Sequence, residues 1–122
     1  SRLNLLTTEI LQKNVLFVKQ KKQFLKYIKS DLKISDLPSK LKKWNESEFK
    51  DFIRLLNVAI KKSDIAKLTK MDEIEWMEVF ETKKAEAQSL KAEIDKIDKE
   101  IDAMVYDLYD LTDEEIAIVE NS

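Results

Sequence analysis

Lysines gathered in two stretches are the side chains of this sequence best placed to bind a partner. In the first stretch, from Lys19 to Lys29, they recur at intervals of three and four residues. Lysines repeated on successive turns of a helix can follow a phosphate backbone without reading bases. The alternative is that they form only a solvated helix face. If the chain binds DNA, we expect the contacts to come from Lys19, Lys22, Lys26, Lys40, Lys42 and Lys43.

The charge of the chain is distributed unevenly. Residues 1–62 contain 15 Lys and Arg against 6 Asp and Glu, whereas residues 63–122 contain 7 against 18. One explanation is that the two halves fold on each other as antiparallel helices and neutralise each other. The other is that part of the basic half faces a polyanion such as DNA. Both explanations can hold together.

Catalytic chemistry has few residues to draw on. The chain has no His, no Cys and no Gly, which removes the commonest general base, thiolate metal ligands and glycine-rich phosphate loops. Glu81 and Lys83 match a nuclease motif only by chance, on a solvated helix face. Asp95, Asp98 and Asp102 could bind Mg²⁺, but heptad spacing explains them as outward polar positions. We therefore expect no catalytic, cofactor-binding or metal-binding residue, and no enzyme activity, in this chain.

A seven-residue apolar repeat between Trp76 and Leu111 organises the chain. Nine of its ten core sites are apolar, a pattern typical of a long helix that packs along another helix. A helix over 70–110 would be about 60 Å long, too long for a compact core. Another part of the chain, or a second molecule, must therefore cover its seam. The two core positions take Phe80, Ala87, Ile94, Ile101 and Leu108, and Lys83, Leu90, Ile97, Met104 and Leu111.

The rest of the chain predicts further helices beside this rod. A wide apolar stripe through Phe17, Phe24 and Ile28 indicates a first helix that is buried on much of its surface. After the break at Pro38, Trp44 lies among lysines and is better explained as a packing anchor than as a nucleic-acid contact. We expect one all-α domain, built on a long antiparallel, coiled-coil-like helical hairpin with one or two short packing helices. The expected helices cover about residues 3–33, 39–44, 48–62, 70–110 and 113–120.

Helix ends and membrane propensity can also be predicted. Thr69 with Asp72, and Thr112 with Glu115, match the capping box that opens a helix. No apolar run approaches the ~20 residues needed to cross a membrane, so we expect no membrane partner and a cytoplasmic location.

The stretch from Ile94 to Glu120 resembles the C-terminal tail of bacterial adenine-specific DNA methyltransferases, above all of single-chain type II (IIG-like) restriction-modification enzymes. The pattern of that tail, E-I-D-x-x-V-Y-x-L-Y-G-L-T-x-E-E-I-x-x-V-E, is matched from Glu100 onward except at Asp110, where the family has Gly. Asp there must take a left-handed conformation, which it tolerates better than most residues, or turn differently. Glu75-Trp76, Phe80 and Lys83 to Gln88 also resemble the E-W-x-x-x-F…K-A-x-A-Q segment that precedes this tail in the family. The scaffold residues of the two matching segments are Trp76, Phe80, Ile101, Val105, Tyr106, Tyr109, Thr112 and Glu115.

The resemblance implies a parent enzyme that methylates adenine with S-adenosylmethionine and cuts DNA nearby with Mg²⁺. The methylase motif Asn-Pro-Pro-Tyr or Phe is absent here, since the only proline is Pro38. We therefore expect a non-catalytic C-terminal scaffold that adjoins the target-recognition region and supports sequence-specific DNA binding, with no cofactor of its own. Its expected partners are DNA, through the parent enzyme, and the methylase and target-recognition regions of the same polypeptide. The alternative is a coiled-coil oligomerisation or protein–protein interaction module, such as a homodimer, without DNA contact.

Overall fold

A computed structural model describes residues 1–121, and every element in that range is a helix. The predicted all-α fold is therefore confirmed. The first helix begins and ends one residue earlier than expected, the second is a 3₁₀-helix, and the long helix ends at Leu108 rather than at residue 110. The elements are α1 (Arg2–Leu32), η1 (Ser39–Glu46), α2 (Phe49–Lys62), α3 (Lys70–Leu108) and α4 (Asp113–Glu120).

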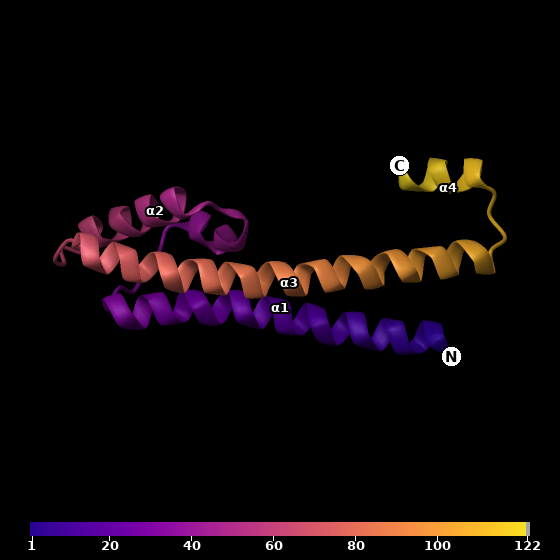
Figure 1. The fold of residues 1–122 in the computed structure, drawn as a ribbon, viewed down its shortest axis with the longest axis horizontal. Helices are drawn as coiled ribbons and strands as arrows, with labels where there is room; N and C mark the ends of the chain where they lie inside the picture. Colours follow the sequence, from indigo (N-terminus) through magenta and orange to yellow (C-terminus); the bar gives the residue numbers. More distant parts are fainter. Residues whose placement is uncertain (122) are drawn as a thin grey trace.

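The helices α1 and α3 form a long antiparallel hairpin (Figure 1). The 39 residues of α3 span about 58 Å. Arg2, the first residue of α1, lies beside Glu100, with a nitrogen-to-oxygen distance of 3.4 Å. Since α3 continues to Leu108, its last two turns extend beyond α1. We call this the open end of the hairpin, and the end where α1 stops and α3 begins the closed end.

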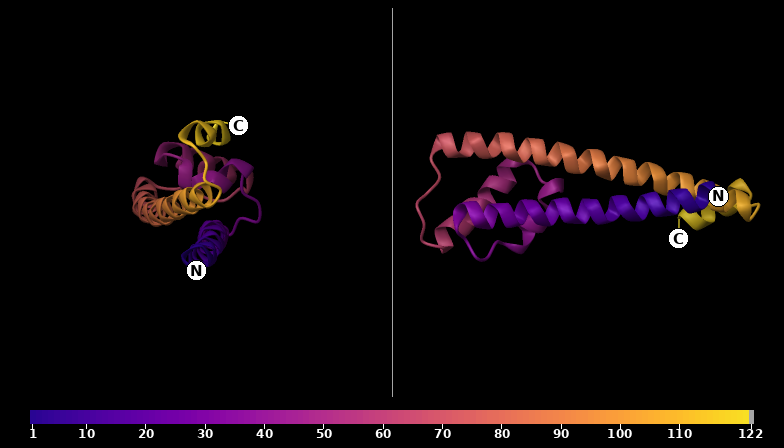
Figure 2. Two further views of the ribbon diagram at one scale, coloured as in Figure 1. Left: turned by 90° about the vertical axis from the view of Figure 1, so that its right-hand side faces the viewer. Right: turned by 90° about the horizontal axis from the view of Figure 1, so that it is seen from below.

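The main core lies at the closed end, where η1 packs against both long helices and α2 packs against α3 and η1, with Phe52 of α2 stacked on Phe24 of α1 (Figure 2). Phe52 and Phe80 are stacked with ring centroids 4.5 Å apart, and Phe24 meets Trp44 edge-on at 4.6 Å. Trp44 is fully buried, which confirms its prediction as a packing anchor. Aromatic pairs in these geometries add about 0.5–1.5 kcal/mol each beyond their burial, so they concentrate stability at this end.

Hydrogen bonds hold η1 to both long helices. The Trp44 indole N–H donates to the Lys21 carbonyl of α1 at 3.2 Å. From α3, the Lys84 ammonium donates to the Ser47 carbonyl at 2.8 Å, and the Gln88 amide donates to the Asn45 carbonyl. The two bonds from α3 satisfy backbone carbonyls that a 3₁₀-helix leaves open at its end, and all three bonds together fix η1 in place.

Three helices end in the same way without a glycine. Lys33, Asp64 and Asp110 each have a positive φ, of 57°, 53° and 54°. In each case the N–H of the following residue bonds a carbonyl five positions back in the helix, as in a Schellman motif. That following residue is apolar and at least partly buried in all three. Asp110 therefore adopts the left-handed conformation that the sequence left open.

The helix starts were also predicted correctly at two places. At the start of α3, Thr69 and Asp72 form both hydrogen bonds of a capping box. At the start of α4, Thr112 and Glu115 do the same. Each box satisfies two of the backbone N–H groups that a helix start leaves free.

The heptad seam of α3 is confirmed from Trp76 to Ile97, where every apolar core site is buried against its neighbours. The prediction is wrong at Leu108, which is 71% exposed. The reason is the register of the hairpin. Because α1 begins opposite Glu100, no part of α1 reaches the last two turns of α3.

The prediction that α1 is buried on much of its surface holds only near the closed end. Phe24 and Ile28 are buried, but Leu11, Val15 and Val18 are exposed. The cause lies in the arrangement of the neighbours: η1 and α2 cover only the closed-end half of α1, so its N-terminal half has α3 alone beside it (Figure 2).

Candidate nucleic-acid interface

Lys19, Lys22 and Lys26 are exposed on one face of α1. Their intervals of three and four residues keep them on the same side of a helix. Phe24, which lies between Lys22 and Lys26 in the sequence, is buried in the core. Residues two positions apart on a helix point about 200° apart, so the lysines face away from the core.

The second group of lysines lies on η1. Lys40, Lys42 and Lys43 are exposed, while Leu41 and Trp44 of the same element are buried. The hydrogen bond from Trp44 to the Lys21 carbonyl places η1 against the turn of α1 that carries Lys19 and Lys22. The core packing of one aromatic residue thus brings the two predicted groups to neighbouring elements. We call these six lysines the lysine surface.

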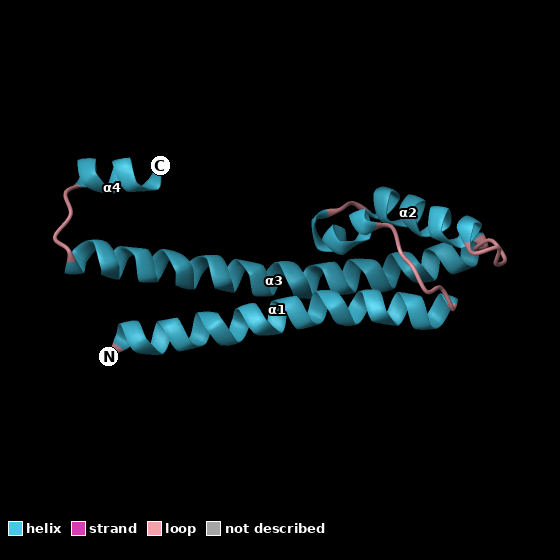
Figure 3. Cartoon of the chain, turned by 180° about the vertical axis from the view of Figure 1, so that it is seen from behind, coloured by secondary structure: helices cyan, strands magenta, loops and turns pink. Residues whose placement is uncertain are grey.

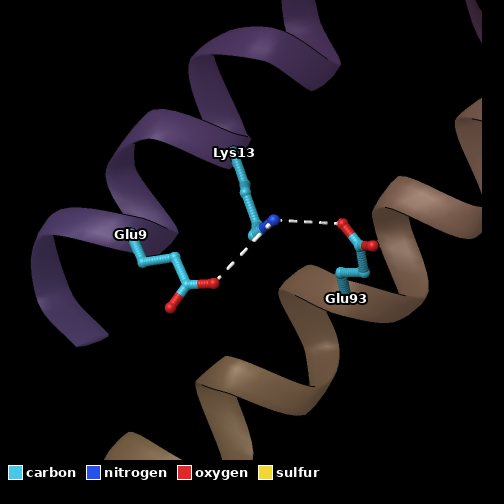
Figure 4. Close-up of polar contacts among 3 residues, drawn as sticks. All are labelled: Glu9, Lys13 and Glu93. Atoms are coloured by element: carbon cyan, nitrogen blue, oxygen red, sulfur yellow. Dashed lines mark hydrogen bonds and ion pairs between the residues drawn. The ribbon is translucent and has the colours of Figure 1, made fainter. Parts of the chain in front are cut away.

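None of the six lysines forms an ion pair with any residue in the range 1–121. Ion pairs across the hairpin involve other residues near the open end. Arg2 pairs with Glu100, and Lys13 lies 3.1 Å from Glu93 and 3.8 Å from Glu9 (Figure 4). Mutual neutralisation of the two halves is therefore limited to a few contacts, and the charge of the lysine surface faces solvent.

The carboxylates considered for chemistry are dispersed. Glu81, Asp98 and Asp102 are exposed, and Asp95 pairs with Lys91 on its own helix at 3.1 Å. Within residues 1–121, no group of three or more acidic side chains is close enough to hold a metal ion. Glu81 and Lys83 are both exposed but point about 200° apart on the helix, and Lys83 instead approaches Glu86 at 3.8 Å.

A cavity in the hairpin seam, lined by both polar and apolar side chains, was not predicted. It has a volume of about 260 Å³ and lies where Lys83, the one charged residue among the heptad core sites, faces α1. Its walls include Gln20, Gln23 and Glu86, over the buried rings of Phe24 and Trp44. The charged core site was the signal in the sequence, but the opposing glutamines could be identified only once the register of α1 against α3 was known.

The residues of the scaffold motif have mixed environments. Trp76 and Phe80 are buried in the core, Ile101, Val105 and Tyr106 are partly buried, and Tyr109 is exposed. Partial burial raises the pKa of the Tyr106 phenol, and the nearby charges of Asp102, Glu120 and Asp98 raise it further. The influence of Glu120 follows from the fold, because α4 turns back along the end of α3 (Figure 3).

Comparison with known proteins adds a family. The family model described as Domain of unknown function (DUF8810) matches residues 1–105, a span that takes in α1, η1, α2 and most of α3 and stops before α4. No curated protein and no solved structure matches the chain. None of the helices within residues 1–121 is long and apolar enough to cross a membrane. Since the match covers well over half of the 122 residues, the chain belongs to the DUF8810 family.

Proposed function

We propose that this chain is a non-catalytic helical scaffold of a cytoplasmic restriction-modification DNA methyltransferase, beside its target-recognition region, and that the lysine surface contacts DNA phosphates. The observation that supports the DNA contact is the exposure of six lysines on two adjoining elements with no ion pair among the described residues. The parent enzyme is proposed from the resemblance of the C-terminal stretch, and it would supply S-adenosylmethionine binding and Mg²⁺-dependent cleavage.

The arrangement favours positioning on DNA over reading of its sequence. Lysines act as flexible point charges, whereas the rigid fork of Arg is better suited to bidentate recognition. The backbone that carries these lysines is held by the closed-end core, so their spacing is fixed by packed helices. A fixed set of phosphate contacts sets the register of a protein on the duplex and leaves sequence selection to a neighbouring region.

Binding of labelled duplex DNA, followed by fluorescence anisotropy over a salt series, tests the proposal. Each phosphate contact contributes about −0.9 to the slope of log affinity against log salt, so six contacts would give about −5. Replacing all six lysines of the surface by Gln should lower the affinity at least about tenfold and flatten that slope.

A matched control removes the same charge elsewhere. The control variant carries Gln at six other lysines, which are also exposed and form no ion pair with residues 1–121. Its slope of log affinity against log salt should stay much steeper than that of the variant without the lysine surface. Equal losses in the two variants would mean that only net charge matters, and absence of binding to wild-type protein at low salt would overturn the DNA contact. The control lysines are Lys61, Lys62, Lys67, Lys70, Lys96 and Lys99.

The parent enzyme is tested separately, by the coding sequence on the N-terminal side of Ser1. An Asn-Pro-Pro-Tyr or Asn-Pro-Pro-Phe motif in the same reading frame would support a methyltransferase. A long reading frame there without such a motif would contradict it, whatever the result of the DNA-binding experiment.

Self-association is the second candidate function, and the exposed apolar residues Leu11, Val15 and Val18 of α1 favour it. The heptad seam of α3 is occupied by α1 of the same chain, so a dimer would have to use another surface. The exposed apolar residues on the N-terminal half of α1 provide such a surface.

A further inference from the structure

The outer face of α1 carries an apolar stripe that no other part of residues 1–121 covers. Leu11, Val15 and Val18 follow one another at intervals of four and three residues and are 61%, 69% and 47% exposed. This spacing places them on one side of the helix, like the core sites of a coiled coil. Lys19 and Lys22 lie four residues beyond Val15 and Val18, so the stripe ends in positive charge.

The helix α4 is the least buried of the helices within residues 1–121. It has eight residues, and none of them is buried. Isolated helices of this length are marginal in water, because most helical stability in proteins comes from packing of an apolar face. Ile118 of α4 is 70% exposed, and the equally exposed Leu108 and Tyr109 precede α4 at the end of α3.

These two features complement each other in length and charge. The eight residues of α4 extend about 12 Å, and the stripe from Leu11 to Val18 extends about 10 Å. The stripe is bordered by lysines, whereas α4 contains acidic residues and no basic one. Charge matched in this way orients a contact and excludes pairing of like surfaces. The acidic residues of α4 are Asp113, Glu114, Glu115 and Glu120.

Within one chain the two features lie apart. The helix α3 separates α4 from α1, as the views in Figures 1 and 2 agree. Only residues 109–112 connect α3 to α4, and they are occupied by the turn at Asp110 and the capping residue Thr112. A short connection of this kind does not carry α4 around α3 to the outer face of α1.

We propose that α4 of one copy of this chain docks along Leu11, Val15 and Val18 of a second copy, with its carboxylates at Lys19 and Lys22. This contact differs from the proposed DNA contact in its partner, which is a second copy of the chain. Four of the six lysines of the lysine surface, Lys26, Lys40, Lys42 and Lys43, take no part in it. A contact of this size buries less than about 1,200 Å², which is typical of weak complexes. Self-association is therefore expected at high micromolar concentrations of the protein.

Sedimentation velocity of the full chain over a concentration series is the test. Wild-type protein should show a mass that rises with concentration, and replacing Val15 and Val18 by Ser should abolish the rise. Replacing Met71 and Ile74, two exposed apolar residues at the closed end, by Ser is the matched control and should leave it unchanged. Monomeric wild-type protein at every concentration, or equal effects of the two double variants, would overturn the proposal.

A charge exchange identifies the two surfaces. Lys19→Glu with Lys22→Glu, and separately Asp113→Lys with Glu114→Lys, should each abolish self-association. Mixing these two variants should restore it, because each α4 then meets a stripe of opposite charge in the other variant. A mixture that stays monomeric would contradict the pairing, and folding of each variant is checked by circular dichroism. DNA binding is measured on the same variants, so failure of one proposal is distinguishable from failure of the other.

Discussion

At the scale of single residues, the left-handed positions at three helix ends affect stability most directly. A residue with a Cβ loses about 1–2 kcal/mol in this conformation, although Asp compensates part of the loss through local hydrogen bonds. The Lys33 side chain cannot form such local hydrogen bonds, whereas the carboxylates of Asp64 and Asp110 can. The three positions therefore differ in strain although their backbone geometry is nearly the same.

Replacing Lys33 by Gly should raise the free energy of unfolding by about 0.5–1 kcal/mol, since the relief of strain exceeds the entropy that Gly loses on folding. Asp110→Gly should change it by less than about 0.5 kcal/mol. Urea denaturation followed by circular dichroism measures both. Lys33→Ala keeps the Cβ and serves as the control, with no comparable gain. A stability of Lys33→Gly at or below that of the wild type would contradict this explanation.

Tyr106 gives a prediction about pH. Its pKa is raised by partial burial and then by neighbouring carboxylates, so the protonated phenol is favoured in the folded state. The stability that this group contributes is fully present below the ordinary tyrosine pKa of about 10 and is lost as pH rises through the folded value.

Absorbance titration of a variant with Tyr27→Phe and Tyr109→Phe isolates Tyr106. Its phenol should ionise at higher pH in the folded protein than in urea, and Asp102→Asn should lower the folded pKa. Asp95→Asn, which removes a carboxylate that does not act on Tyr106, is the control. A pKa that is the same in urea and in buffer would rule the effect out.

At the scale of elements, the aromatic residues of the closed end hold four helices together. Phe80 of α3 is fully buried and contacts the rings of Phe52, Phe49 and Trp44 at 4.5, 5.8 and 6.4 Å. One side chain thus joins α3 to both α2 and η1.

Phe80→Ala should lower the free energy of unfolding by about 3–5 kcal/mol, because it leaves a cavity as well as losing apolar burial. Met71→Ala, at an exposed position of the same helix, should change it by less than about 0.5 kcal/mol. Thermal and urea unfolding measure both. A loss below about 1 kcal/mol at Phe80 would mean that the closed end contributes little to stability.

Only part of the arrangement of these helices could be predicted from the sequence. The heptad pattern of α3 and the capping boxes predict local structure well, because they depend on neighbours within one helix. The exposure of Leu11, Val15 and Val18 could not be predicted, since a wide apolar stripe does not tell which side another element will cover. The cavity at Lys83 also depended on the register between two helices, which no local pattern sets. Whether the six lysines bind DNA stays a prediction.

At the scale of the whole molecule, packing and charge divide the hairpin into two unequal halves. The closed end contains the clustered core, whereas the open end relies on one seam and on exposed ion pairs. Exposed ion pairs contribute at most about 1 kcal/mol each, so they do not compensate for a missing core. We therefore expect the two ends to open independently.

Native-state hydrogen exchange should show this division. Amides of α3 near Phe80 should exchange only through global unfolding, while those of residues 101–108 should exchange by local opening with a much smaller free energy. Mass spectrometry of peptic fragments resolves the two regions. Uniform protection along α3 would show that the hairpin unfolds as one unit and would contradict the expectation.

The position of the two chain ends gives the hairpin a mechanical property. Ser1 and the end of α4 both lie at the open end, whereas the lysine surface lies toward the closed end (Figure 1). The 31 residues of α1 extend about 46 Å, so a body attached at the chain ends holds the molecule as a lever arm. A tilt of about 5° at the attachment displaces the far tip by about 4 Å over that length, comparable to the rise of one base pair.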